Sequence, residues 1–332
     1  MAIEISAILT TFNRAEFLPL VLDALVNQTL ARDKFEVIVV NDGSSDDTLS
    51  ILDRYRNILP IKCFTLRHSG IATVKNIGVF AAQAPIVVFL DDDDTLHPNA
   101  LRAHFHAHQT HSEPRQAILG HTNLAPEVTK SPVMDYVVNR AGLLFSYSNL
   151  SSSRQYGWRE FWGGRSSCKR SFLVENGMFT PEFHFGYEDI ECGWRLNSLG
   201  LEVFYEPAAQ STMVRSVTFD GFCTRSYRQG VAAHHFHRLH PVSIIRDYLQ
   251  IEETIALWER CWRDYGYILR TARQADQSAR EALDSDPAEN DRLGMLYDSS
   301  FRLSFAKGFQ DAASLAEGRP QRKQVGYGLP GR

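Results

Sequence analysis

The sequence predicts an α/β protein with a mostly parallel sheet, covered by helices on both faces and followed by a helical C-terminal region. Apolar segments alternate with amphipathic ones through the first hundred residues. The apolar segments are nearly continuous rather than alternating, which is typical of strands buried on both faces. Beyond about residue 219 the strand signal fades and helical patterns dominate. Together these observations indicate a single large sheet domain with a helical extension.

Four short apolar segments are the expected strands, at residues 5–9, 35–40, 61–66 and 85–90. Three of them run directly into polar residues, which read T-T-F-N, N-D-G-S-S and D-D-D-D. Ligands of open α/β sheets bind beyond the carboxyl ends of the strands. The sequence therefore predicts that polar and acidic side chains converge on one edge of the sheet.

Helices are expected between these strands. Residues 17–27 form the first, with Pro19 tolerated because it falls in the first turn. Ser44 or Ser45 is a plausible N-cap for the second. Residues 70–82 form the third, and Pro98 precedes the fourth. This alternation of strands and helices is what a parallel sheet requires.

The rest of the chain is less regular at first and then helical. Residues 117–215 show no clean alternation of elements, whereas residues 227–267 read as helices that include one stretch at 247–263. Another helix is expected at residues 291–315. The tail, residues 318–332, contains glycines, prolines and basic residues, a composition that predicts disorder.

The composition excludes several classes of protein. The 332 residues include 35 Lys and Arg and 39 Asp and Glu, which gives a net charge of −4. This charge argues against a nucleic-acid-binding scaffold. The longest apolar run, Ala84 to Leu90, has seven residues and is far shorter than the ~20 that cross a bilayer. The first residues, MAIEISAILTT, do not resemble a signal peptide. We therefore expect a cytoplasmic protein without a transmembrane segment.

Cysteine and histidine patterns do not predict a transition-metal site. None of the five cysteines belongs to a C-x-x-C pair, which argues against a zinc knuckle. The histidines gather in two stretches without an H-E-x-x-H pattern, and we expect them on polar faces of helices. These stretches contain His104, His106, His108, His111, His234, His235, His237 and His240.

The four consecutive aspartates, Asp91 to Asp94, are the strongest chemical signal. The chain has neither G-x-G-x-x-G after the first strand nor a P-loop, so a bound phosphate needs another counter-charge. Carboxylates can supply it by holding a hard divalent cation, and Asp91 and Asp93 would project to the same side of an extended segment. An acidic helix N-terminus before Pro98 is the alternative. Four adjacent carboxylates repel one another more than capping requires, which favours the cation.

Six motifs in fixed order resemble the family 2 glycosyltransferases. In the N-terminal half these are T-T-F-N-R, V-N-D-G-S-S-D-D-T, K-N-I-G and F-L-D-D-D-D. Further on, G-G-R-S-S-C-K-R-S-F-L-V-E-N-G-M-F and F-G-Y-E-D-I-E-C-G-W-R-L complete the resemblance, which covers about residues 3–207. It implies the GT-A fold and an inverting transfer of a sugar from a nucleotide diphosphate donor.

The resemblance also implies a domain division. Residues 1–218 would form the GT-A domain, with a nucleotide-sugar-binding half at 1–116 and an acceptor-side half at 117–218. Residues 219–317 would form the helical region. Its mixed charges favour an acceptor-binding lid or a homodimer interface over a peripheral membrane contact.

The resemblance assigns the donor site. Thr10 and Phe12 match positions that line the nucleobase pocket, and Asp42 matches a carboxylate that accepts the base imide N–H. Lys75 matches a position near the donor at which the family commonly has an arginine. Lysine keeps the positive charge but lacks the planar guanidinium group that can form two parallel hydrogen bonds. Asp92 would meet the ribose.

The metal ligands follow from the same match. Asp93, with Asp91, would hold Mn²⁺ or Mg²⁺ against the diphosphate, so Asp91 also belongs to the donor site. Many relatives carry a histidine after the Y-E-P segment, whereas Pro207 is followed here by A-A-Q-S-T-M. Water could complete the coordination, or the metal dependence could be weak. Arg165 stands where asparagine is frequent after the paired glycines.

Glu188 and Asp189 resemble the family's E-D motif, with Asp189 as the general base. A single displacement needs one base on the acceptor hydroxyl and not the carboxylate pair of a glycosidase. Nearby aromatic residues could desolvate this base and make it more basic. The acceptor-side candidates are Trp162, Gly164, Phe185 and Tyr187.

The sequence thus predicts a metal-assisted inverting glycosyltransferase with a nucleotide diphosphate sugar as donor, UDP favoured. The acceptor would be a hydroxyl of a saccharide or glycoconjugate. A sugar-phosphate nucleotidyltransferase would need a glycine-rich loop with arginine after the first strand, which T-T-F-N-R does not supply. A non-catalytic nucleotide-sugar-binding protein of the same fold remains an alternative.

Overall fold

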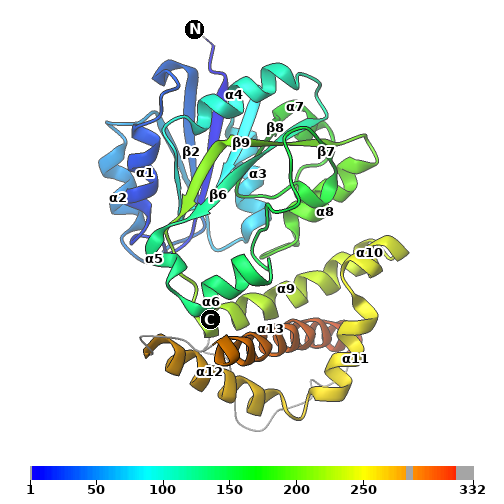
Figure 1. Cartoon of the computed structure of the whole chain (residues 1–332). Helices are drawn as coiled ribbons and strands as arrows, with labels where there is room; N and C mark the ends of the chain where they lie inside the picture. Colours follow the sequence, from blue (N-terminus) through cyan, green and yellow to red (C-terminus); the bar gives the residue numbers. More distant parts are fainter. Residues whose placement is uncertain (1, 282–286, 319–332) are drawn as a thin grey trace. The chain divides into compact units, whose positions relative to one another are not determined.

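The computed structural model describes residues 2–281 and 287–318 (Figure 1). Its contacts divide the chain into two compact units. Unit 1 comprises Met1–Val128, Tyr147–His184 and Glu188–Arg215. Unit 2 comprises Thr129–Ser146, Phe185–Tyr187 and Ser216–Arg332. The short segment Phe185–Tyr187 thus belongs to unit 2 although the residues on either side of it belong to unit 1.

Unit 1 contains a nine-stranded sheet with the order β3-β2-β1-β4-β8-β6-β9-β5, in which β7 also pairs with β9. The strands are β1 (Ile5–Thr11), β2 (Phe35–Asn41), β3 (Ile61–Thr65), β4 (Ile86–Leu90), β5 (Asp94–Leu96), β6 (Gln116–Leu124), β7 (Gln155–Tyr156), β8 (Ser166–Lys169) and β9 (Glu202–Met213). The first four are mutually parallel. The four apolar segments of the sequence are therefore confirmed as strands.

The strand directions bring distant parts of the chain to one edge of the sheet. Strand β8 is antiparallel to both β4 and β6, so β6 runs in the same direction as β4. Strand β9 is parallel to β6. The ends of β1, β4 and β9 and the beginning of β8 consequently share an edge, which we call the carboxyl edge. Short β5 is antiparallel to β9 and pairs Asp94 with Met213 there.

Helices cover both faces of this sheet, because every residue of β1, β2 and β4 is buried. Ile5 and Leu9 lie in one core cluster with Leu18 and Leu22 of α1. On the other face, Ile8 packs against Gly78 of α3, where a Cβ would lie 2.3 Å from the Ile8 methyl. The helices of unit 1 are α1 (Leu18–Val26), α2 (Thr48–Tyr55), α3 (Ile71–Ala81), α4 (Ala100–Thr110), α7 (Arg170–Glu175) and α8 (Glu188–Asn197), with 3-10 turns at Arg32–Lys34 and Trp158–Glu160.

Unit 2 is helical in its described part. It contains α6 (Pro132–Asp135), a π-helical turn (Tyr136–Arg140), α9 (Phe219–Leu239), α10 (Ser243–Tyr248), α11 (Ile251–Cys261), α12 (Tyr265–Glu281) and α13 (Pro287–Ala316), while the short α5 (Pro126–Thr129) ends just inside it. Helices α9 and α13 touch through their backbones: a Cβ on Gly230 would lie 1.9 Å from the carbonyl of Phe305, and one on Gly308 equally close to that of Tyr227. Only glycine permits such close packing of two helices.

Some expectations need correction. The helix expected at residues 247–263 is broken, because Gln250 has a φ of +51° and separates α10 from α11. His104 and His108 do not lie on a polar face: both are buried and contact the Ser167 hydroxyl. Residues 117–215, which looked irregular, supply β6, β8 and β9. Of the tail expected to be disordered, residues 319–332 lie outside the described residues.

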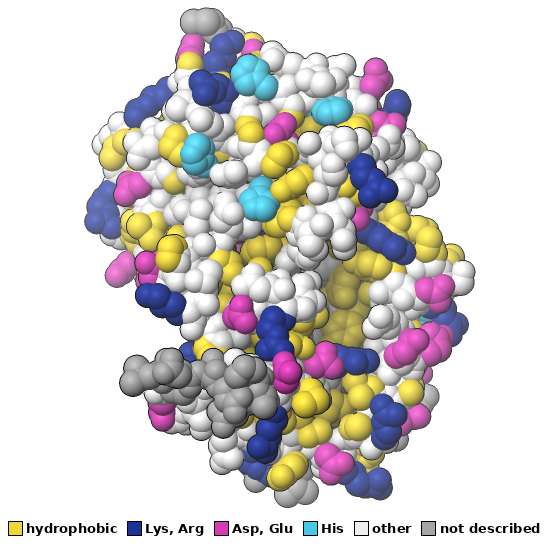
Figure 2. Space-filling view, viewed as in Figure 1, with side chains coloured by type: hydrophobic (Ala, Val, Ile, Leu, Met, Phe, Trp, Pro, Cys, Tyr) yellow, Lys and Arg dark blue, Asp and Glu magenta, His cyan; other side chains and the backbone are white. Residues whose placement is uncertain are grey.

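The surface carries mixed charge. Figure 2 shows basic and acidic side chains interspersed over the visible face, with no large patch of one sign. In the part of the chain that the structure describes, no helix is both long and apolar enough to cross a membrane.

Candidate active site

The four aspartates follow β4 at the carboxyl edge. The chain turns at Asp92 and Asp93, and the Asp94 amide lies 3.4 Å from the Asp91 carbonyl. Asp94 then begins β5. The expectation that Asp91 and Asp93 share one side of an extended segment is therefore wrong, because the segment is a turn.

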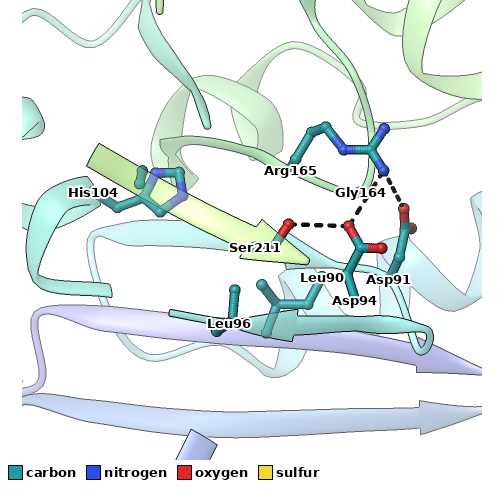
Figure 3. A pocket seen from close by; sticks show the side chains of 9 residues that line it. Leu90, Asp91, Asp94, Leu96, His104, Gly164, Arg165 and Ser211 are labelled. Carbon is teal, nitrogen blue, oxygen red and sulfur yellow. Dashed lines mark hydrogen bonds and ion pairs between the residues drawn. The ribbon is translucent and has the colours of Figure 1, made fainter. Parts of the chain in front are cut away.

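Three arginines face the aspartates. Arg165, just before β8, places Nη2 3.1 Å from Asp91 Oδ2 and 3.4 Å from Asp94 Oδ2 (Figure 3). Arg215, two residues after β9, pairs with Asp93. Arg14, after β1, has Nε 3.5 Å from Asp92 Oδ1. Each carboxylate of the turn thus has a guanidinium partner.

Burial raises the pKa of two of these carboxyl groups, Asp92 and Asp94. It raises the pKa of Asp92 to about 7, with help from the neighbouring Asp93 charge. It also raises the pKa of Asp94 to about 7, although Arg165 acts in the opposite direction. The acidic partners raise the pKa of Arg165 despite its burial, so this guanidinium stays charged. Asp94 Oδ2 also accepts from Thr122 and Ser211, at 3.2 and 3.1 Å.

The carboxylate oxygens of the four aspartates suit a hard divalent cation, which prefers oxygen ligands of this kind. Asp94 Oδ1 is buried and has no hydrogen-bond partner among the described residues, so an oxygen remains for a further ligand. Within the same residues, no three acidic, histidine or cysteine side chains are grouped tightly enough to hold a metal by themselves. A cation here would need oxygens from the donor or from water, and it would compete with Arg165 and Arg215 for Asp91 and Asp93.

A small pocket opens beside Asp91 and Asp94, with room for about one water molecule (Figure 3). It is lined by Leu90, Asp91, Asp94, Leu96, His104, Gly164, Arg165, Ala209 and Ser211. The pocket is too small for a hexose, so it is a small recess beside the aspartates and not a sugar site.

Asp189 lies in the first turn of α8 with its carboxylate fixed by two backbone amides. Gly163 N–H donates to Oδ2 at 2.7 Å, and Ile190 N–H donates to Oδ1 at 2.8 Å. Burial, and then the neighbouring Glu188 charge, raise the pKa of Asp189 to about 6, whereas Lys75 acts to lower it. A carboxylate with this pKa is ionised near neutral pH and is a stronger base than an exposed aspartate.

Lys75, on α3, forms a buried ion pair with Glu188. Its Nζ lies 2.7 Å from Glu188 Oε1, and the two side chains are only 4% and 8% exposed. Glu188 and Asp189 raise the pKa of Lys75 despite the opposing effect of burial. The sequence predicts Lys75 near the donor. The structure pairs it with Glu188 beside Asp189, and its donor contact stays a prediction.

Gly163 and Gly164 separate Asp189 from Asp91. A Cβ on Gly163 would lie 3.0 Å from the Asp189 Cβ and 2.3 Å from Lys75 Nζ. A Cβ on Gly164 would lie 1.9 Å from Asp91 Oδ2. Two consecutive residues therefore contact the proposed base and the first aspartate, and a side chain at either position would displace the groups beside it.

The expected nucleobase residues lie at the ends of β1 and β2. Thr10 is buried within β1, whereas Phe12 is 38% exposed and stacks on His68, with ring centroids 4.3 Å apart. Asp42 accepts from the amides of Ser69 and Gly70 at 2.6 and 3.1 Å. His68 Nδ1 lies 3.0 Å from Asp42 Oδ2. The carboxylate assigned to the base therefore also anchors the following loop.

The acceptor-side candidates are divided between the two units. Trp162 is half-buried, donates to the Arg159 carbonyl at 2.7 Å and packs edge-on against Tyr147. Phe185 and Tyr187 belong to unit 2, where Phe185 lies under the Arg225 and Arg228 guanidinium groups. Tyr187 has a φ of +61°, an unfavourable conformation for a non-glycine residue, directly before Glu188.

Sequence reasoning missed four residues at this edge. Arg14, Arg165 and Arg215 pair with the aspartates, and His68 covers Phe12. Arg165 was noted only as a departure from the family pattern. Their positions in the chain could have indicated them. Arg14 follows β1 and Arg215 follows β9, and both strands end at the carboxyl edge.

Comparisons with known proteins show what the chain resembles. Residues 6–132 match the model of "Glycosyl transferase family 2". This part of the chain is therefore similar to the family 2 glycosyltransferases. The validoxylamine A glucosyltransferase of Streptomyces hygroscopicus is 30% identical over 221 residues, which are 59% of this chain and 52% of that enzyme. The chain thus spans about half the length of that curated relative.

Solved structures show that the chain has the GT-A fold and that the similarity extends over the helical region. A mannosyltransferase of Pyrobaculum calidifontis, solved with GDP-Man and Mn²⁺, has a TM-score of 0.57 at 19% identity. The alignment covers 94% of this chain and 86% of that one. TarS 1-349 of S. aureus, in complex with UDP, has a TM-score of 0.55 at 16% identity, over 97% and 94% of the two chains. At these identities the likeness concerns the fold.

Proposed function

We propose that this protein is an inverting glycosyltransferase that moves a sugar from a nucleotide diphosphate donor to a hydroxyl of a saccharide or glycoconjugate. One observation carries the proposal. The buried carboxylate of Asp189 and the carboxylate of Asp91 contact adjacent glycines, Gly163 and Gly164. A base for the acceptor and an acidic turn for the donor diphosphate are thereby held next to each other.

Asp189 is the proposed general base. It takes the proton from the acceptor hydroxyl while that oxygen bonds to the anomeric carbon and the bond to the diphosphate breaks. The electrons of the broken bond leave with the diphosphate. Because the hydroxyl oxygen attacks the face of the anomeric carbon opposite this leaving group, the configuration inverts. The amides of Gly163 and Ile190 hold the carboxylate in place, and Lys75 balances the charge of Glu188 beside it.

Asp91 and Asp93 are the proposed ligands of a divalent cation, Mn²⁺ or Mg²⁺. Such a cation, when bound, stabilises the negative charge on the departing diphosphate. The support is the type of donor group, the unpartnered Asp94 Oδ1 among the described residues, and the presence of Mn²⁺ with GDP-Man in a structure of similar fold.

We propose a UDP-sugar as donor, with Phe12 stacking on the base, Thr10 lining its pocket, Asp42 facing the imide and Asp92 facing the ribose. The exposed ring of Phe12 and the position of Asp92, which accepts from the Phe12 amide at 3.3 Å, support this arrangement. Structures of similar fold contain UDP in one case and GDP-Man in another, so both bases belong in the test. A homodimer through the C-terminal helices stays a proposal.

The test is a donor panel. Purified protein is incubated with UDP-, GDP- and TDP-sugars, with and without Mn²⁺, and thermal shift and donor hydrolysis are measured. A metal-dependent shift with one nucleotide class is expected. The absence of any shift with every nucleotide diphosphate would overturn the proposal.

A further inference from the structure

We propose that Arg165 and Arg215 form the binding subsite for the donor diphosphate, and that a divalent cation releases them by taking over Asp91 and Asp93. The inference rests on the proposed function and adds residues that the family resemblance does not assign. In the structure described here, both guanidinium groups pair with the aspartates that would hold the cation.

The position of Arg165 supports this role. Its side chain is 13% exposed, and Nη2 points between Asp91 and Asp94 (Figure 3). Gly164, the preceding residue, touches Asp91, so Arg165 lies where the acidic turn and the glycine pair meet. A planar guanidinium can exchange a carboxylate for a phosphate with little movement, because both offer paired oxygens to the same fork.

Arg215 contacts the next part of the turn, at Asp93. Its side chain is 26% exposed and pairs with Asp93, and the preceding residue, Val214, donates its amide to the Asp93 carbonyl at 2.9 Å. This backbone bond fixes the end of β9 to the acidic turn. The guanidinium can therefore change partner while its backbone stays in place.

Charge balance favours an exchange over simple addition. A divalent cation brings two positive charges, and the two phosphates of a sugar nucleotide bring two negative ones. If the cation takes Asp91 and Asp93 and the arginines take the phosphates, these charges all keep a partner of opposite sign, whereas unpaired buried charges would be costly. Asp94 loses Arg165 in this exchange but keeps its hydrogen bonds from Thr122 and Ser211. If the arginines stayed on Asp91 and Asp93, the cation would lack its carboxylates.

The exchange would also favour the chemical step. When the sugar leaves, the nucleotide diphosphate gains a further negative charge. Hydrogen-bonding groups that bind this charge more strongly in the transition state than in the ground state increase kcat. Two arginines released at the carboxyl edge are suited to this purpose.

The experiment measures two affinities in Arg165→Gln and Arg215→Gln by calorimetry. The first is for Mn²⁺ alone, and the second is for UDP in saturating Mn²⁺. Each lost charge-assisted hydrogen bond is worth roughly 1.5–3 kcal/mol, so UDP affinity should fall about 10- to 150-fold. The affinity for Mn²⁺ alone should rise, because the carboxylates no longer have a competitor.

Arg115→Gln is the matched control. Arg115 pairs with Glu202 at 3.2 Å and precedes β6, at the opposite edge of the sheet, so both affinities should stay unchanged. Circular dichroism and melting establish that each variant folds. Arg165 is the more buried of the two arginines. If its variant does not fold, the measurements on Arg215→Gln alone test the inference.

The inference requires that the arginine variants bind UDP more weakly and Mn²⁺ alone more tightly than the wild type. Unchanged UDP affinity in folded variants would overturn the inference and leave the proposed function intact. A parallel loss of both affinities would also overturn it, because the arginines would then only position the aspartates. Failure of the wild-type protein to bind any nucleotide diphosphate would instead refute the proposed function and the inference with it.

Discussion

Lys75 and Glu188 are 113 positions apart in the chain and form a buried ion pair of 2.7 Å between Nζ and Oε1. The pair joins α3, which follows the third strand of the N-terminal half, to the first residue of α8, which carries Asp189. It therefore links the donor-side motif K-N-I-G to the E-D motif. Its geometry leads to the first prediction.

Lys75→Met should destabilise the protein by about 3–5 kcal/mol, because it leaves Glu188 buried without a partner. Urea unfolding measures the change. The double variant Lys75→Met, Glu188→Met should recover much of the loss, since no buried charge then remains unpaired. Strictly additive effects of the two substitutions would show that the ion pair is energetically irrelevant.

Asp189→Asn should reduce transfer roughly 10²- to 10⁴-fold, the usual contribution of a general base. Affinity for UDP should be nearly unchanged, because the base faces the acceptor. Asparagine can still accept the Gly163 amide, so the variant should fold as the wild type does. Weakened UDP binding combined with surviving transfer would refute the assignment of Asp189.

The pH dependence of kcat/KM should show an acidic limb. Asp189 acts in its deprotonated form, so kcat/KM should be low below its pKa and rise as the pH increases through about 6. Glu188 is one cause of this raised pKa, and Glu188→Gln should move the limb to lower pH. A limb that does not move in a folded variant would mean that a different group titrates.

Gly164→Ala should weaken Mn²⁺-dependent UDP binding, because the new Cβ would lie 1.9 Å from Asp91 Oδ2 and push that carboxylate away. The control is Gly157→Ala, where the nearest atom to a new Cβ is Asn197 Oδ1 at 3.7 Å. Equal UDP affinities of the two variants, measured by calorimetry, would argue against a role for Asp91.

Asp93→Ala should remove the effect of Mn²⁺ on UDP affinity, and EDTA should have the same effect on the wild-type protein. Titrations with UDP, with and without Mn²⁺, measure this difference. If Asp93→Ala retained the full Mn²⁺ effect, the cation would bind elsewhere.

The sequence predicted the sheet well because its strands are continuous apolar segments, and these are buried from Ile5 to Thr11 and from Ile86 to Leu90. It predicted an acidic site at Asp91 to Asp94 because four consecutive carboxylates are unusual at a strand end, and it predicted a role for Glu188 and Asp189 from their resemblance to the family's E-D motif. It did not predict β8, whose four residues read S-S-C-K and carry no apolar pattern. Pairing with β4 and β6, and not local propensity, makes that segment a strand.

The arginines of the site could not be predicted for a related reason. Arg165 and Arg215 are 74 and 122 positions from their aspartate partners, and nothing in the local sequence distinguishes them from surface arginines. His104 and His108 were assigned to a polar face because histidine is usually partly exposed, yet Ser167 from β8 meets both rings in the interior. Each of these errors concerns a contact between segments that are far apart in the sequence, which local sequence patterns do not reveal.

The glycine pair beside Asp189 and Asp91 has an architectural consequence. Since one dipeptide touches both carboxylates, their separation is defined by local backbone geometry and is independent of the length of the intervening loops. Insertions or substitutions in those loops could change which alcohol is recognised without altering how far the proton acceptor stands from the leaving group. A scaffold of this kind can diversify its substrates while its chemistry stays constant.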